Sequence, residues 1–177
     1  MLTMSSALDR CRRLYGGRRA IVDAEGTWTW AQHLDRVARA AAILSARGVT
    51  PGQRFGILSR NIFRHAELLH AGYWMGAVPV PVNIRLAAPE IAFILKDADV
   101  KALAVDEPFL PLIAHEQIAP FAKNAFAVSP KPLGGALPDY ETLLKSSGPH
   151  PRFENQENDD AILLYTGGTT GRSKGVR

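Results

Sequence analysis

Short apolar runs alternate with segments of helical periodicity along most of this 177-residue chain. The runs cover residues 55–58, 78–82, 102–105, 125–128 and 161–165, and each has the length of a buried strand. Between them, apolar residues recur at the spacing of helices that bury one face. Strands that alternate with helices indicate βαβ units, whose right-handed crossovers place helices on both faces of a sheet. The pattern therefore predicts an α/β fold with a mostly parallel sheet in three layers, αβα.

The first part of the chain carries clear start and stop signals. Residues 20–29 favour a hairpin around Glu25-Gly26. Thr29 and Gln32 then have the form of a capping box, which opens an amphipathic helix. Gly48 stands where a left-handed residue ends such a helix.

A second helix is expected over residues 63–75, with Asn61 as its N-cap and Gly76 at its end. Its predicted inward side chains are Ile62, Ala66, Leu69 and Tyr73. The next strand has Pro79 and Pro81 at alternate positions, so one of its sides lacks N–H donors. This strand is therefore predicted at the edge of the sheet or leaving it.

The second half of the chain carries fewer cap and turn residues that mark where helices begin. A third helix is predicted from Pro89 without a side-chain cap, because Ala87 and Ala88 offer no acceptor. A further helix is expected over residues 109–115. Residues 129–160 are rich in Pro, Gly, Ser and charge, so we interpret them as a surface connection apart from a short helix at residues 140–145.

Composition limits the protein class. The chain is 46% hydrophobic and 21% charged with a net charge of +4, an ordinary globular balance. Cys11 is the single cysteine, which excludes a disulfide framework within the chain. No apolar run reaches ~18 residues, so we predict a protein that is cytoplasmic, or at most peripheral to a membrane, without stable membrane insertion. Five N-terminal arginines are interpreted as a solvated helix and turn, and no nucleic-acid partner is predicted because no binding motif accompanies them: Arg10, Arg12, Arg13, Arg18 and Arg19.

The stretch richest in chemistry is residues 163–175, Leu-Leu-Tyr-Thr-Gly-Gly-Thr-Thr-Gly-Arg-Ser-Lys-Gly. Its glycines let backbone N–H groups turn toward a ligand, its threonines add hydroxyl groups, and Lys174 adds a positive charge. Ligands of open α/β sheets bind outside the carboxyl ends of strands. An ordinary surface loop is the alternative, since Gly and Thr are common in turns. The combination directly after an apolar strand favours a polyphosphate site.

Two other nucleotide-binding loops are not favoured. A Walker A loop needs Gly-Lys-Ser/Thr followed by a helix, whereas Lys174 follows Ser173 and precedes the extended-looking Gly175-Val176. The dinucleotide fingerprint after the first strand is also missing. An unrelated P-loop-like kinase is therefore the less favoured enzyme class.

The loop resembles the phosphate-binding signature of the adenylate-forming enzymes, which include acyl-CoA synthetases, luciferases and peptide-synthetase adenylation domains. That signature commonly runs Tyr-Thr-Ser-Gly-Thr-Thr-Gly-x-Pro-Lys-Gly. This chain departs from it at Gly167, where Ser is usual, and at Ser173, where Pro is usual. The resemblance extends upstream to residues 27–54 and to residues 72–91, so it covers essentially residues 20–177.

The resemblance implies an ATP-dependent acyl-CoA ligase. In such enzymes a carboxylic acid reacts with ATP and Mg²⁺ to give an acyl-adenylate and pyrophosphate, and the thiol of coenzyme A then forms a thioester. The implied contacts to the ATP phosphates come from Thr166, Gly167, Gly168, Thr169, Thr170, Gly171 and Lys174. No residue of the chain is assigned a catalytic role or a place in a metal site.

The implied organisation has two parts: residues 1–19 as an N-terminal helix and turn, and residues 20–177 as the first α/β subdomain of an AMP-binding domain that ends just after the phosphate loop. The family's acyl pocket, adenine contacts and C-terminal domain follow this loop. We therefore expect this chain to need that missing C-terminal part and to be inactive alone. A non-catalytic nucleotide-binding or interaction module is the alternative. The acyl substrate, the acceptor thiol and the oligomeric state, including a homo-oligomer, stay open.

Other candidate residues have simpler interpretations. The five histidines show no metal-ligand spacing and are interpreted as structural or surface residues. Asp159-Asp160 is interpreted as a solvated pair rather than a Mg²⁺ site. The three tryptophans are interpreted as core residues.

Overall fold

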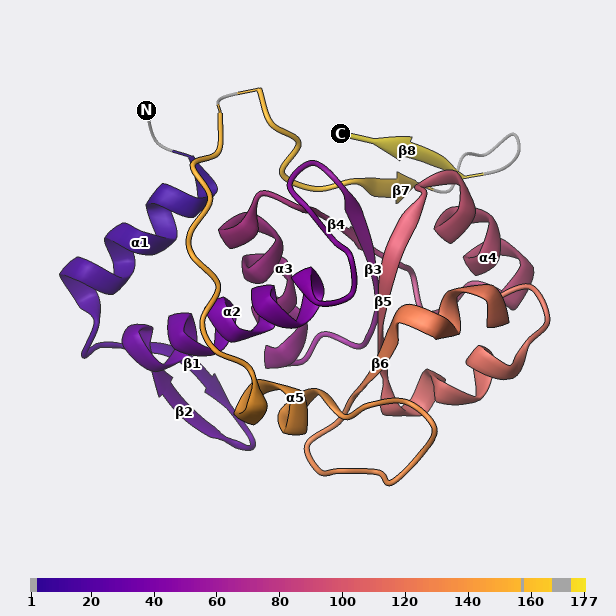
Figure 1. Ribbon diagram of the computed structural model, residues 1–177, viewed down its shortest axis with the longest axis horizontal. Coiled ribbons are helices and arrows are strands. Elements are labelled where there is room, and N and C mark those ends of the chain that lie inside the picture. The colour runs from indigo at the N-terminus through magenta and orange to yellow at the C-terminus, as the bar shows by residue number, and fades with distance from the viewer. Residues whose placement is uncertain (1–2, 157, 167–172) are drawn as a thin grey trace.

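The computed structural model describes residues 3–156, 158–166 and 173–177. Its central sheet has four parallel strands in the order β4-β3-β5-β6 (Figure 1). These strands are β3 (Arg54–Leu58), β4 (Val78–Pro81), β5 (Val100–Asp106) and β6 (Ala125–Val128). The predicted parallel sheet is confirmed, and the proline-containing β4 lies at its edge as predicted.

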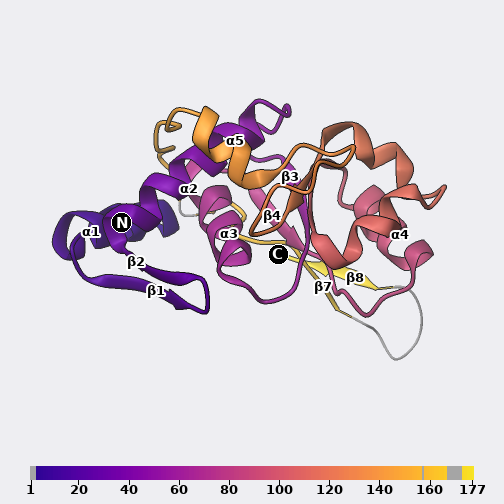
Figure 2. The same ribbon diagram turned by 90° about the horizontal axis from the view of Figure 1, so that it is seen from below.

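Helices cover both faces of this sheet (Figures 1 and 2). Phe55 and Ile57 of β3 pack with α2 (Trp30–Ser45) and α3 (Phe63–Met75). Leu58 packs in a second core on the opposite face, which also holds Ile91, Ile94 and Leu95 of α4 (Ala88–Asp97). Since adjacent side chains of a strand point to opposite faces, one short strand supplies both cores. The predicted three-layer αβα arrangement is confirmed.

Local signals at the first helices are confirmed in part. β1 (Arg19–Asp23) and β2 (Gly26–Thr29) form the predicted antiparallel hairpin. Thr29 and Gln32 complete the capping box of α2: the Gln32 N–H donates to Thr29 Oγ1, and the Thr29 N–H donates to Gln32 Oε1 at 2.9 Å. Gly76 ends α3 with a φ of 74°, the left-handed conformation that glycine adopts without strain.

One prediction about α3 is wrong and another is incomplete. Its N-cap is Ile62 and no side chain caps it, so Asn61 does not have the predicted role. Three of the four predicted inward residues are half-buried and pack against the core, but Arg64 and Glu67 are buried as well. The physical reason is that α3 contacts α1, α2 and β4, so more than one of its sides is covered. A single apolar stripe does not describe such a helix.

The helix predicted over residues 109–115 is a 3₁₀ helix, η1 (Glu107–Ala114), followed by a second one, η2 (Ala119–Asn124). Pro111 lies inside η1 and has no N–H to donate, which disfavours a regular α-helix there. Both segments pack against the α4 face of the sheet through residues such as Phe109, Ile118 and Phe121.

Residues 129–160 are more than the predicted surface connection. Tyr140 and Leu144 of α5 (Tyr140–Ser146) are buried in the core. The chain then crosses α2 and α3: the His150 N–H donates to the Ala38 carbonyl, and the Phe153 N–H donates to the Trp74 carbonyl. Ser5 of α1 (Met4–Tyr15) donates its hydroxyl to the Phe153 carbonyl at 3.1 Å. Backbone hydrogen bonds, which composition does not reveal, fix this segment.

The last strand also differs from its prediction. β7 (Leu164–Thr166) is exposed or half-buried, and it pairs antiparallel with β8 (Lys174–Val176) instead of joining the parallel sheet. Beside β4, the Leu163 N–H donates to the Pro79 carbonyl at 3.0 Å. Pro79 and Pro81 have no N–H groups to return, so this edge of the sheet does not support a further regular strand.

Candidate functional site

The β7–β8 pair brings the two described ends of the predicted phosphate loop together. Thr166 lies opposite Lys174 in the antiparallel register, and Tyr165 lies opposite Gly175. Directly opposed residues of an antiparallel pair project their side chains from the same face. The hydroxyl of Thr166 and the ammonium of Lys174 therefore stand on one face of the ribbon, where both can approach one ligand.

The ribbon is attached to the domain through Tyr165. Its hydroxyl donates to Asp97 Oδ2 at 2.6 Å, and Asp97 is the last residue of α4. Burial and the neighbouring Asp97 carboxylate raise the pKa of Tyr165, so this phenol stays protonated and remains a donor. This anchor was missed by sequence reasoning, because no pattern connects two residues 68 positions apart.

Lys174 is exposed, and among the described residues its ammonium group has no carboxylate partner. The neighbouring Arg177, by contrast, lies 3.6 Å from Asp160. An unpaired ammonium on a flexible stem is suited to contact an anion.

The predicted site residues divide into two groups. Thr166 and Lys174 lie in β7 and β8 and are brought together by the register. The other five lie outside the described residues: Gly167, Gly168, Thr169, Thr170 and Gly171.

Asp159 and Asp160 have local contacts within the described residues. The Gln156 N–H donates to Asp159 Oδ2 at 2.7 Å, which is a local turn contact. Within the described part of the chain, no group of three His, Cys, Asp or Glu side chains is arranged to hold a metal ion. The interpretation of the aspartates as an ordinary polar pair is consistent with this geometry.

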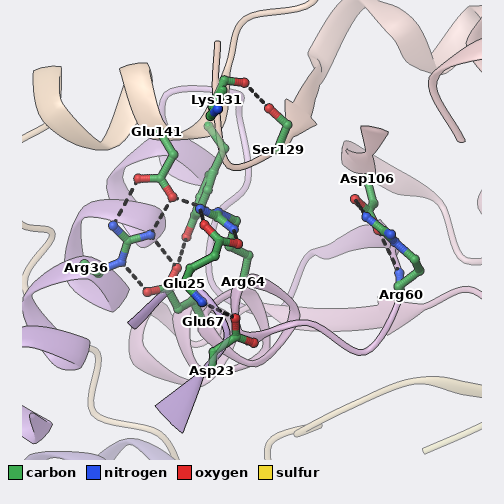
Figure 3. Close-up of polar contacts among 11 residues, drawn as sticks. Asp23, Glu25, Arg36, Arg60, Arg64, Glu67, Asp106, Ser129, Lys131 and Glu141 are labelled. Atoms are coloured by element: carbon green, nitrogen blue, oxygen red, sulfur yellow. Dashed lines mark hydrogen bonds and ion pairs between the residues drawn. The ribbon is translucent and has the colours of Figure 1, made fainter. Parts of the chain in front are cut away.

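An ion pair lies at the carboxyl edge of the parallel sheet. Asp106, at the end of β5, accepts from the Arg60 guanidinium at 2.7 and 3.1 Å and from the Arg60 N–H at 3.2 Å (Figure 3). The Asp106 side chain is 1% exposed and that of Arg60 is 51% exposed. Hydrogen bonding to Asp106 raises the pKa of Arg60. Asp106 is therefore a buried carboxylate whose charge is balanced by a half-exposed guanidinium.

A second group of charges lies between three helices and the β1–β2 turn, is mostly buried, and was not predicted from the sequence (Figure 3). We call it the ion cluster; its members are Glu25, Arg36, Arg64, Glu67 and Glu141. Arg36 of α2 donates to Glu67 of α3 and to Glu141 of α5. Arg64 of α3 donates to Glu141 at 2.7 Å and to the two oxygens of Glu25 at 2.6 and 2.8 Å.

The ion cluster joins four elements through paired charges. The Tyr140 hydroxyl adds a donor to Glu67 at 3.2 Å. The Phe63 ring lies 4.3 Å from the Arg64 guanidinium and stacks on Trp28. Each carboxylate in this cluster already accepts hydrogen bonds from a guanidinium, so the cluster holds the hairpin and helices together instead of offering a binding group.

Two histidines that are distant in sequence also meet. His33 Nε2 and His70 Nδ1 are 2.8 Å apart between α2 and α3. Burial, with smaller contributions from His70 and Arg36, lowers the pKa of His33 to about 3. Burial also lowers the pKa of His70. Both rings are therefore neutral near neutral pH, which confirms the structural interpretation for this pair.

Comparison with known proteins places the chain in a family. Residues 8–177 match the family described as AMP-binding enzyme. A 3-oxocholest-4-en-26-oate–CoA ligase of Rhodococcus rhodochrous is 34% identical over 84% of this chain and 28% of its own length. A butyrate–CoA ligase of Arabidopsis thaliana is 34% identical over 99% of this chain and 33% of its own length. The chain thus spans about a third of the length of these curated relatives.

Solved structures show the same fold. The anthranilate–CoA ligase in complex with anthranoyl-AMP has a TM-score of 0.90 over 99% of this chain and 34% of its own, at 22% identity, which supports the fold alone. The inhibitor-bound N-terminal domain of FACL13 from Mycobacterium tuberculosis has a TM-score of 0.86 at 28% identity, over 99% of this chain and 44% of its own. By its match to the family and by its curated relatives, which are CoA ligases, this chain belongs to the AMP-binding enzyme family.

Proposed function

We propose that this chain is the N-terminal part of an ATP-dependent acyl-CoA ligase and that residues 166–174 hold the phosphates of ATP. The observation that carries the proposal is the β7–β8 register, which sets the Thr166 hydroxyl beside the Lys174 ammonium. Both groups are suited to oxyanions, one as a neutral donor and the other as a cation. The family supplies the reaction class, since the curated relatives are CoA ligases.

We assign to residues 166–174 the binding and orientation of the ATP phosphates. ATP, when bound, supplies the α-phosphorus that a carboxylate attacks and the pyrophosphate that leaves. Thr166 and Lys174 would hold the β- and γ-phosphate oxygens, where negative charge increases as the pyrophosphate departs. Removing one preorganised donor from such a charge typically raises the barrier by ~2.7–4 kcal/mol. We assign backbone donation to Gly167, Gly168 and Gly171, and hydroxyl donation to Thr169 and Thr170, on the resemblance of the loop alone.

Mg²⁺ and coenzyme A are the further components that we propose for the reaction. Mg²⁺ is proposed as the partner of the ATP phosphates on the resemblance of the loop, and no residue of the chain is assigned to hold it. Coenzyme A is proposed as the acceptor because the relatives are CoA ligases. The names of those relatives cover a steroid carboxylate and butyrate, so a carboxylic acid is the finest substrate class proposed here.

The second candidate is a nucleotide-binding or interaction module without turnover. It is favoured for the 177 residues by themselves, because they span about a third of the length of enzymes that catalyse the reaction. We propose that these residues contribute the phosphate contacts and that turnover needs further sequence of the family's length.

The experiment that tests the proposal is ATP titration of the protein encoded by the complete reading frame, with Lys174→Ala and a matched Lys131→Ala variant. Lys131 is also exposed and carries the same charge. Loss of a charge-assisted contact is expected to weaken ATP binding about tenfold or more in Lys174→Ala. The Lys131 variant should bind like the wild type. Equal affinities in all three proteins would contradict the assignment of Lys174.

Pyrophosphate exchange separates the two candidate functions. A panel of short, long and aromatic carboxylic acids is offered to the complete protein and to the 177 residues alone. We expect the complete protein to catalyse pyrophosphate exchange and the 177 residues alone to show none. Robust exchange by the 177 residues would refute the second candidate, and no exchange by either protein would refute the ligase proposal for these acids.

A further inference from the structure

The outward side of α1 and the turn after it carry a dense positive charge. Five exposed arginines lie within ten residues, with no acidic residue between them: Arg10, Arg12, Arg13, Arg18 and Arg19. Their five charges exceed the net charge of +4 of the whole chain, so the remaining sequence is close to neutral. Among the described residues, only Arg13 of these five has a carboxylate partner, Asp9 at 3.0 Å. The charge is therefore concentrated and largely uncompensated.

Apolar side chains are exposed at the same end of the molecule. Leu14 is 58% exposed, Tyr15 is 41% exposed and Met4 is 47% exposed. Over the described residues, seven large hydrophobic side chains are exposed, and four of them lie within the first 22 positions. Their concentration beside the arginines distinguishes them from the scattered apolar residues of an ordinary surface.

The geometry places an arginine and an apolar side chain together on the outward surface of α1. The inner side of α1 is fixed by the buried Leu8 and Ser5. Arg10 and Leu14 are one turn apart, so they lie on the same outer face of the helix. The Arg18 guanidinium lies 5.2 Å from the centre of the Tyr15 ring. Figures 1 and 2 both show α1 at one end of the molecule, away from β7 and β8.

We propose that this surface, formed by residues 10–19, binds the anionic face of a lipid bilayer. Clustered arginines are attracted to anionic headgroups, and leucine and tyrosine side chains enter the interfacial region beside them. A nucleic-acid backbone would use the arginines but would leave Leu14 without a role. The proposal goes beyond nucleotide binding and does not depend on it.

Attachment through this surface is peripheral. None of the helices described by the structure is long and apolar enough to cross a bilayer. A few inserted side chains with exposed charges give reversible binding that weakens as salt screens the headgroups. The surface would bring the protein to a membrane without anchoring it there.

Co-sedimentation with vesicles tests the proposal. The protein is mixed with vesicles of phosphatidylcholine alone or of phosphatidylcholine with phosphatidylserine, at low and at physiological salt. Binding is expected only with phosphatidylserine and is expected to fall with salt. The triple variant Arg10→Gln, Arg12→Gln, Arg13→Gln should weaken binding by about fivefold for each arginine removed. Leu14→Ser should weaken it severalfold without changing the charge.

A second triple variant, Lys123→Gln, Lys131→Gln, Lys145→Gln, removes the same charge from exposed positions elsewhere and should bind vesicles like the wild type. Circular dichroism checks that each variant is folded. No binding to phosphatidylserine vesicles, or an equal loss in both triple variants, would overturn the proposal. Binding to duplex DNA that equals vesicle binding and is unaffected by Leu14→Ser would assign the surface to nucleic acid instead.

Discussion

The ion cluster and the β7–β8 ribbon hold charge in opposite ways. In the ion cluster, Arg64 and Glu67 are 3% and 1% exposed, and each is hydrogen-bonded to an opposite charge from another element. In the ribbon, Lys174 is exposed and, within the described residues, has no such partner. Buried charges must be paired to be tolerated, whereas an exposed cation keeps its capacity for a ligand.

This difference separates residues that maintain the fold from residues that can act. A substitution in the ion cluster should change stability and leave nucleotide affinity of the folded protein unaltered. A substitution in the ribbon should do the reverse. The segment at residues 147–163 joins the two regions, because it leaves α5, crosses α3 and leads into β7.

The largest effect is expected for Glu67→Gln in the ion cluster. Glutamine keeps the shape but leaves the partly buried Arg36 without one of its two carboxylates. Removing one partner of a buried ion pair costs about 3–5 kcal/mol, which urea unfolding measures. Asp35→Asn breaks the exposed pair with Arg39 and should cost no more than about 1 kcal/mol. Equal costs in the two variants would show that burial does not distinguish these pairs.

A somewhat smaller effect is expected for Gly76→Ala, where the joining segment crosses α3. Gly76 has a φ of 74°, and a Cβ there would lie 2.3 Å from the Phe153 ring. Strain and overpacking together should cost about 2–4 kcal/mol in thermal or urea unfolding. Gly48 has a φ of 82° with nothing within 4 Å of such a Cβ, so Gly48→Ala should show the strain alone. If Gly48→Ala lowers the free energy of unfolding as much as Gly76→Ala does, the contact with Phe153 does not add to the cost of the Gly76 substitution.

Acid should destabilise the helical region through His33. Its pKa is about 3 in the folded protein and near 6.5 when unfolded, so the unfolded state binds more protons between these values. Stability is therefore complete above pH 6.5 and falls as the pH decreases toward 3. Between pH 7 and 5 the loss from this group is about 2 kcal/mol. His33→Gln should flatten that dependence, and an unchanged slope in urea titrations would assign the acid sensitivity to other groups.

The smallest effect on stability is expected for Tyr165→Phe. Loss of the hydroxyl contact with Asp97 should cost less than about 1 kcal/mol, because the pair is exposed. If this contact orients the ribbon, ATP affinity should nevertheless fall about threefold or more in equilibrium titration. Tyr73→Phe is a matched control, since Tyr73 is half-buried and its hydroxyl makes no hydrogen bond with the part of the chain that the structure describes. An unchanged ATP affinity in Tyr165→Phe would make this anchor purely structural.

Local and periodic signals predicted the fold well. The four strands of the parallel sheet, the capping box at Thr29 and the end of α3 at Gly76 depend on near neighbours in the chain, and all appear as expected. Two of the failed predictions depend on distant neighbours: residues 129–160 pack on helices, and β7 does not join the parallel sheet. The failed cap at Asn61 is a local error, because helix α3 begins one residue later than that cap requires.

The candidate site shows the same division. The residue types at 166–174 indicated phosphate binding, and the family match agrees with that class of protein. The pairing of Thr166 with Lys174 and the anchor at Asp97 are spatial facts that residue types do not contain. The ion cluster was missed because its arginines and glutamates look like ordinary solvated residues of helices until α2, α3 and α5 are packed together.

By itself, the sequence determined the four strands of the parallel sheet and the main helices around them, and it showed which loop is rich in donors suited to an oxyanion. Those properties follow from side-chain periodicity and backbone preferences that act over a few residues. The tertiary structure alone decided which charges are buried and paired and which remain free. That outcome depends on contacts between residues tens of positions apart, such as Arg36 with Glu141, which only a folded arrangement of elements creates.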